Sequence, residues 1–157
     1  MLKASLERQW RARPWWMNLM LLFCLYMTFV YMPFDIFIKP VAVDEEVWFG
    51  ITLHGWAAKL TAPLHWLIYG AGAYGFWKMR PWMWPWAAVY SAQVTFSMLV
   101  WNLLDPRGGG WLAGLVAAAV FLIPTVALWR ARARFAAVAP PEQALTPEQA
   151  PPPGQAL

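Results

Sequence analysis

The chain has 157 residues, of which 61% are hydrophobic and only 13% are charged. Soluble domains carry about 25% charged residues, so this composition excludes an ordinary soluble domain. The net charge of +4 is no sign of nucleic-acid binding, because the basic residues form short clusters beside apolar runs, a pattern typical of membrane topology.

Four apolar runs predict an all-α fold, an integral membrane bundle of about four transmembrane helices over residues 16–135. Each run approaches or exceeds the roughly 20 residues needed to cross the hydrocarbon core of a bilayer. Pro33 and Pro124 lie inside runs, which membranes tolerate where neighbouring groups satisfy the freed backbone. The predicted spans cover residues 16–38, 50–77, 84–104 and 111–129.

The distribution of basic residues predicts the orientation. An N-terminal arm over residues 1–15 is basic and rich in tryptophan, so we expect it to lie at the membrane interface. The loop after the second span and the segment after the fourth are also basic, whereas the other two loops contain acids. By the positive-inside rule both termini are cytoplasmic, which in a bacterium means the inner membrane. Nine of the twelve basic residues fall on this side: Lys3, Arg8, Arg11, Arg13, Lys78, Arg80, Arg130, Arg132 and Arg134.

The C-terminal tail, residues 136–157, differs in composition from the rest of the chain. Its sequence repeats Pro-Glu-Gln-Ala at 141–144 and 147–150 and then adds three more prolines. A segment of this kind cannot bury a core. We expect a solvated, disordered spacer, and a docking peptide is the alternative.

Two histidines and a lysine interrupt the second apolar run. His54, Thr61 and His65 follow one another at i, i+7 and i+11, so on one helix they share a face. The histidines would then lie roughly 16 Å apart and could not share a metal ion; we expect no metal and no cofactor. Either histidine could be catalytic; the alternative is that His54 lies near the outer interface and His65 hydrogen-bonds to another helix. Lys59 either extends to the outer surface or pairs with an acid.

Polar residues of the first and third runs are the other candidates. Asp35 ends the first span, where apolar surroundings would raise the pKa of a carboxyl and make it a proton donor. The alternative is an exposed helix-end acid, which is also the favoured interpretation of Asp44 and its neighbours. Tyr90, Gln93 and Ser97 share a stripe of the third span, and an amide in mid-membrane needs hydrogen-bonding partners.

Four stretches of the chain together resemble the EXPERA group, which includes the emopamil-binding sterol isomerases and the sigma-two receptor. The first span ends in Met-Pro-Phe-Asp at 32–35, and the second ends in Ala-Tyr-Gly-Phe-Trp-Lys at 73–78. The third contains Val-Tyr-Ser at 89–91 and ends at Asp105, and the fourth contains Leu-Ile-Pro at 122–124.

This resemblance implies a helical bundle around an internal pocket for sterol-like amphiphiles. It also implies that Asp35 and Asp44 are pocket acids. The chain departs from the family at the glutamate of the second helix, because the matching position is near Thr61; His65 is the residue that could take its place.

The sequence therefore predicts an intramembrane pocket for a sterol-, isoprenoid- or lipid-like molecule. The pocket either binds this ligand or isomerises it by acid–base chemistry, with Asp35 and His65 as the catalytic residues, and we expect these two and Gln93 to face one cavity between the first three spans. A different class is a non-catalytic subunit of a larger membrane complex, or a homo-oligomer, packed through small residues of the fourth span. The predicted ligand-binding residues are Asp44, Thr61, Tyr69, Tyr90, Gln93, Ser97 and Trp101.

Overall fold

The computed structural model describes residues 10–11 and 13–136. Most of the predicted N-terminal arm and nearly all of the predicted tail, residues 136–157, lie outside the described residues. The helical elements are α2 (Trp15–Tyr26), the π-helix η1 (Met27–Tyr31), α3 (Met32–Phe37), the 3₁₀ turn η2 (Val41–Val43), α4 (Trp56–Lys78), α5 (Met83–Leu104), α6 (Gly110–Arg130) and α7 (Arg132–Ala136). The strands are β1 (Glu45–Trp48) and β2 (Ile51–His54).

Three of the helices are long and apolar enough to cross a membrane. They are α5, α6 and the continuous helix that runs from Trp15 to Phe37 through α2, η1 and α3. The prediction of a mostly helical chain with apolar helices of membrane-spanning length is confirmed at this level. Helix α4 has 23 residues, which is also a spanning length, but its sequence is less apolar than that of the other three.

The π-helix η1 lies just before Pro33, in the middle of the first span. The Met32 N–H bonds to the carbonyl of Met27, and Pro33 has no N–H, so neither can donate to the carbonyl of Thr28. The indole Nε1 of Trp66 in α4 donates to this oxygen at 2.7 Å. A backbone group left free by the proline is thereby satisfied from a neighbouring helix, and the first span is held against α4.

The second apolar run is predicted to be one helix, but its first residues belong to a β-hairpin. Strands β1 and β2 pair antiparallel, with Glu45 opposite His54 and Trp48 opposite Ile51. The turn residues Phe49 and Gly50 both have positive φ, 52° and 85°, as in the two-residue type I′ turns that suit hairpins.

The hairpin has a consequence for the predicted face of the second span. His54 lies in β2, whereas Thr61 and His65 lie in α4. The three residues therefore do not share a helical face.

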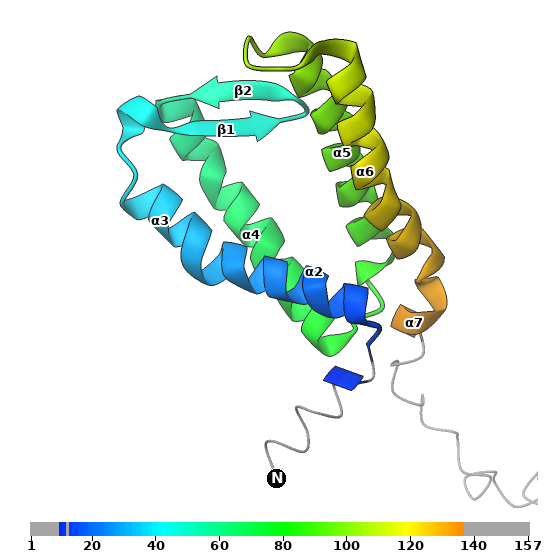
Figure 1. Cartoon of the computed structure of the whole chain (residues 1–157). Helices are drawn as coiled ribbons and strands as arrows, with labels where there is room; N and C mark the ends of the chain where they lie inside the picture. The colour runs from blue at the N-terminus through cyan, green and yellow to red at the C-terminus, as the bar shows by residue number, and fades with distance from the viewer. Residues whose placement is uncertain (1–9, 12, 137–157) are drawn as a thin grey trace, which may run out of the picture.

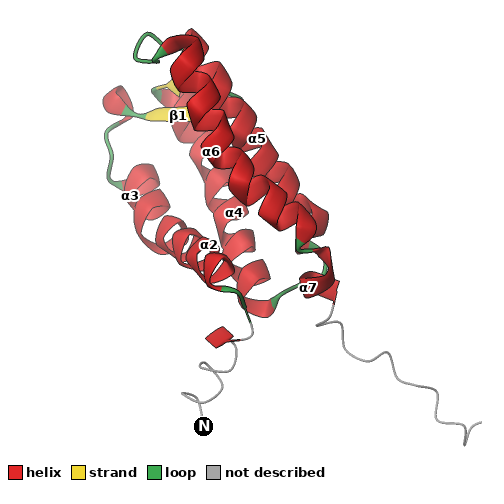
Figure 2. Ribbon diagram, turned by 45° about the vertical axis from the view of Figure 1, so that its right-hand side comes forward, coloured by secondary structure: helices red, strands yellow, loops and turns green. Residues whose placement is uncertain are grey.

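The helices form two pairs, joined at both ends. The first span packs on α4, and α5 packs on α6; the hairpin crosses between the two pairs at one end (Figure 1). A Cβ on Gly50 would lie 2.4 Å from Cβ of Val100, which shows how closely the hairpin turn approaches α5. A second view shows the first span and α4 on one side and α5 and α6 on the other (Figure 2).

An apolar core joins the two pairs at the opposite end. Met17 of α2, Phe76 of α4, Met83 of α5 and Phe135 of α7 belong to one buried cluster. Arg13 adds to this junction, because its Nη1 donates to the carbonyls of Phe76 and Trp77 at 3.4 and 3.0 Å. A guanidinium at the last turn of α4 also interacts favourably with the helix dipole.

Candidate functional site

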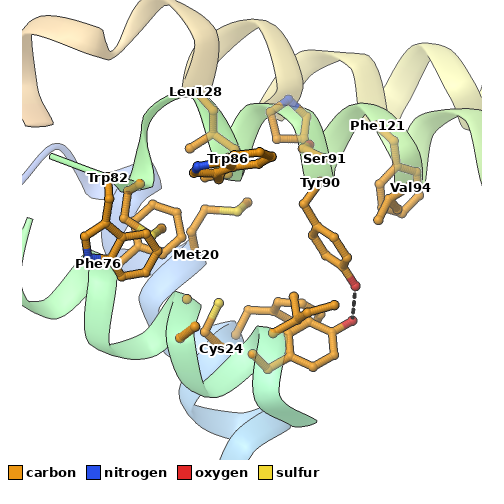
Figure 3. Close-up of a pocket in the computed structure, with 18 residues that line it drawn as sticks. Met20, Cys24, Phe76, Trp82, Trp86, Tyr90, Ser91, Val94, Phe121 and Leu128 are labelled. Atoms are coloured by element: carbon orange, nitrogen blue, oxygen red, sulfur yellow. Dashed lines mark hydrogen bonds between the residues drawn. The ribbon is translucent and has the colours of Figure 1, made fainter. Parts of the chain in front are cut away.

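A cavity of about 510 Å³ lies between the two helix pairs (Figure 3). Pockets for drug-sized molecules have volumes of roughly 300–1,000 Å³. The cavity is lined from all four long helical segments, including Met20 of α2, Tyr69 of α4, Trp86 of α5 and Phe121 of α6. It exists because the hairpin and the apolar core fix the two pairs at their ends, while the middle segments of α4 and α5 stay apart.

The lining of the cavity is almost wholly apolar. Its phenol and hydroxyl groups belong to Tyr69, Tyr90 and Ser91, and within the described part of the chain no charged side chain lines it. The hydroxyl of Tyr90 donates to that of Tyr69 at 3.5 Å. The Ser91 hydroxyl is 2.8 Å from that of Thr125 in α6, so it forms a hydrogen bond between α5 and α6.

A second polar group, which we call the charge cluster, consists of Asp35, Lys39, Asp44 and Lys59. Nζ of Lys39 lies 2.9 Å from both Oδ1 of Asp35 and Oδ1 of Asp44, and Nζ of Lys59 lies 3.0 Å from Oδ2 of Asp44. Lys59 also donates to the backbone carbonyls of Asp35 and Lys39. Both aspartates are only 1% exposed.

The ion pairs of the charge cluster shift the pKa values of Asp44 and Lys39 more strongly than burial does. Burial alone would raise the pKa of Asp44, but Lys39 and Lys59 lower it below its usual range. Burial alone would lower the pKa of Lys39, but Asp44 and Asp35 raise it well above its usual range. Both groups therefore stay charged around neutral pH, and the charge cluster connects the end of the first span, the loop before β1 and the first turn of α4.

The histidine of α4 faces the hairpin. Nδ1 of His65 lies 2.6 Å from Oε2 of Glu46 in β1. The ring of Trp48, also in β1, stacks on the imidazole with centroids 4.0 Å apart and planes at 5°. His65 thus fixes the inner face of the hairpin on α4.

A third contact group holds the hairpin on the loop between α5 and α6. Oδ2 of Asp105 accepts from the hydroxyl of Thr52 at 2.7 Å, and Arg107 reaches Oδ1 of Asp105 at 2.9 Å and Oε2 of Glu45 at 2.8 Å. The hydrogen bonds from Arg107, and to a smaller extent the one from Thr52, hold the pKa of Asp105 well below its usual range. The hairpin therefore contacts both helix pairs through polar groups.

The residues predicted from sequence fall into separate groups. Tyr69 and Tyr90 line the cavity. Asp35 and Asp44 belong to the charge cluster, and His65 pairs with Glu46. None of Asp35, His65 and Gln93 lines this cavity, in contrast to the expected common site. The physical reason is that other residues of the chain already contact these polar groups: Lys39 pairs with Asp35, Glu46 lies within hydrogen-bonding distance of His65, and Ser97 accepts from Gln93.

The remaining predicted residues make local contacts. Thr61 bonds to the carbonyls of Ala57 and Ala58 in its own helix. The amide of Gln93 donates to the buried hydroxyl of Ser97 one turn away, at 2.8 Å. The guanidinium of Arg107 lies over the ring of Trp101, 5.8 Å from its centroid. Lys59 takes the second of its two predicted roles, since it pairs with an acid.

Two features were missed in the sequence. The apolar lining of the cavity has no distinct signal, because side chains that face a cavity and side chains that face lipid have the same composition. The hairpin does have a signal: β-branched and aromatic residues on both sides of Gly50 are typical of two short strands and a turn. In the described part of the chain, no group of three or more His, Cys, Asp or Glu residues is placed to hold a metal.

Comparison with protein-family models, with curated proteins and with solved structures found no match.

Proposed function

We propose that this protein crosses the membrane four times and binds one sterol-, isoprenoid- or lipid-like molecule in the cavity between its helix pairs. In this proposal α4 is the fourth span and both termini are cytoplasmic, as the basic clusters at the two ends predict. The observation that carries the binding proposal is the cavity of about 510 Å³ with an apolar lining and two tyrosine hydroxyls.

The contacts of the acids favour binding over isomerisation. An acid–base isomerase needs a proton donor and a base within reach of the same ligand. Asp35 is paired with Lys39, and His65 lies against Glu46 and Trp48, outside the lining of the cavity. We therefore propose a binding protein, with the EXPERA resemblance as an expectation about fold and ligand class only.

The subunit hypothesis has less support. It assigned the small residues of α6 to contacts with a partner. Gly114 is instead buried against α5, where a Cβ would lie 3.1 Å from Cδ1 of Leu99. Its lack of a side chain is thus explained within this chain.

Filling the cavity tests the binding proposal. Ala87 lines the cavity on α5, and Ala87→Phe would place a ring in the space that the ligand occupies. When the ligand is bound, the added ring overpacks the cavity, which costs typically about 1–3 kcal/mol. We therefore expect retention of the co-purifying ligand to fall roughly tenfold or more, while the protein still folds. The measurement is mass spectrometry of lipids extracted from the purified protein, with monodispersity as the test of folding.

A matched control distinguishes the effect of filling the cavity from the effect of adding a large side chain elsewhere on a helix. Ala119 is exposed on α6, so Ala119→Phe adds the same ring at the lipid-facing surface and should leave the extracted lipids unchanged. If the two variants and the parent protein carry the same lipids in the same molar ratio, the cavity is not a binding site and the subunit hypothesis gains.

A further inference from the structure

We propose that the bound lipid is uncharged and that its polar end is a hydrogen-bond acceptor oxygen, held by the Tyr69–Tyr90 pair. This inference rests on the proposed function and narrows it to one chemical class: long-chain isoprenoid or sterol-like alcohols, ketones and quinones. It excludes fatty acids, phospholipids and amines as the ligand of this cavity.

The absence of charge in the lining carries the first step. Moving a charged group from water into an apolar site is strongly unfavourable unless a counterion is present. Among the described residues, those that line the cavity include no charged side chain. The cations Lys39 and Lys59 are not free to serve a ligand head group, because they pair with Asp35 and Asp44 in the charge cluster.

The second step compares the O–H donors of the tyrosine pair with the acceptors available to them. Two phenols have two O–H donors, and their mutual bond of 3.5 Å uses one of them. Whichever ring donates, the other proton has no acceptor among the described residues. Both rings are half-buried, and a donor held away from water without an acceptor is unfavourable. A ligand oxygen that accepts this proton removes the cost, whereas a hydrocarbon does not.

The arrangement of the lining supplies the third step. The tyrosine hydroxyls lie on one side of the cavity, away from Phe76 and Trp82 on the other (Figure 3). The remaining lining is formed by thioether, aromatic and aliphatic side chains such as Met20, Trp86 and Leu128. This one-ended polarity fits a molecule with one polar atom at one end and a long apolar body.

The test compares three probes of one carbon skeleton. They are geranylgeraniol, the hydrocarbon that lacks its hydroxyl, and geranylgeranoic acid at a pH well above the pKa of its carboxyl. Equilibrium binding to the full-length protein in nanodiscs is measured for the parent chain and for the double variant Tyr69→Phe/Tyr90→Phe. We expect the alcohol to bind the parent roughly tenfold more tightly than the hydrocarbon, and the acid more weakly than the alcohol.

The double variant should lose this preference, because it removes both donors and leaves the apolar lining in place. The control Tyr26→Phe/Tyr74→Phe removes two exposed hydroxyls from α2 and α4 and should keep the preference. Equal binding of alcohol and hydrocarbon by the parent, or tightest binding of the acid, would overturn this inference and leave the proposed binding function standing. If Ala87→Phe weakens the binding of none of the three probes, both this inference and the proposed binding function are overturned.

Discussion

Replacing Lys59 by Met is expected to lower the free energy of unfolding by about 3–5 kcal/mol, the cost of breaking a buried ion pair on one side. The variant leaves Asp44, which is 1% exposed, with Lys39 as its one cation among the residues that the structure describes. It also removes the donor to the carbonyls of Asp35 and Lys39. The loss is measured by unfolding in a mixed detergent series.

The control for this prediction is Lys78→Met, at the exposed last turn of the same helix. It removes the same charge, Lys78 forms no ion pair with another described residue, and surface changes usually cost within about 0.5 kcal/mol. The double variant Asp44→Asn/Lys59→Met should be less unstable than the sum of its single variants, because the second change removes the charge that the first left unpaired. Equal losses for Lys59→Met and Lys78→Met would contradict the charge cluster.

Replacing Gly50 by Ala is expected to release the hairpin from α5. The new Cβ would lie 2.4 Å from Cβ of Val100 and 2.8 Å from the backbone nitrogen of Trp101, so a rigid part of α5 blocks it. The positive φ of 85° adds about 1–2 kcal/mol of backbone strain. Together with overpacking we expect a loss of roughly 2–5 kcal/mol and faster proteolysis within residues 44–55.

A substitution at Gly110 separates the cost of backbone strain from the cost of overpacking against α5. It also has a positive φ, 72°, but a Cβ there would meet nothing within 4 Å. Gly110→Ala should therefore cost only the backbone strain, about 1–2 kcal/mol, and leave the hairpin protected. Similar effects of the two substitutions would show that the hairpin turn is not docked on α5.

The membrane helices could be predicted from sequence because their signal is local. A run of about 20 apolar residues is recognised from its own length and hydropathy, and α5 and α6 end within a few residues of the predicted positions. The hairpin differs from the sequence prediction, which places β1 in a loop and β2 in the same span as α4. Gly50, the turn residue of the hairpin, is the first residue of the predicted second span.

The candidate site was predictable only in part. Tyr69 and Tyr90 were found because polar groups on helical stripes inside apolar runs must face protein or ligand. The partners of Asp35 and His65 could not be found in this way. They depend on where the hairpin places Asp44 and Glu46, and such contacts between distant segments leave no periodic signal in the sequence.

The central claim, one uncharged lipid in the cavity, is tested most directly by photo-cross-linking in the membrane. A small diazirine-bearing amino acid is placed at position 94, where Val94 lines the cavity, or at position 112, where Leu112 is 77% exposed. After irradiation the adducts are identified by mass spectrometry. We predict one uncharged lipid at position 94, lost in combination with Ala87→Phe, and the mixed phospholipids of the membrane at position 112. The same phospholipid mixture at both positions, or cross-links at position 94 only within the chain, would contradict the claim.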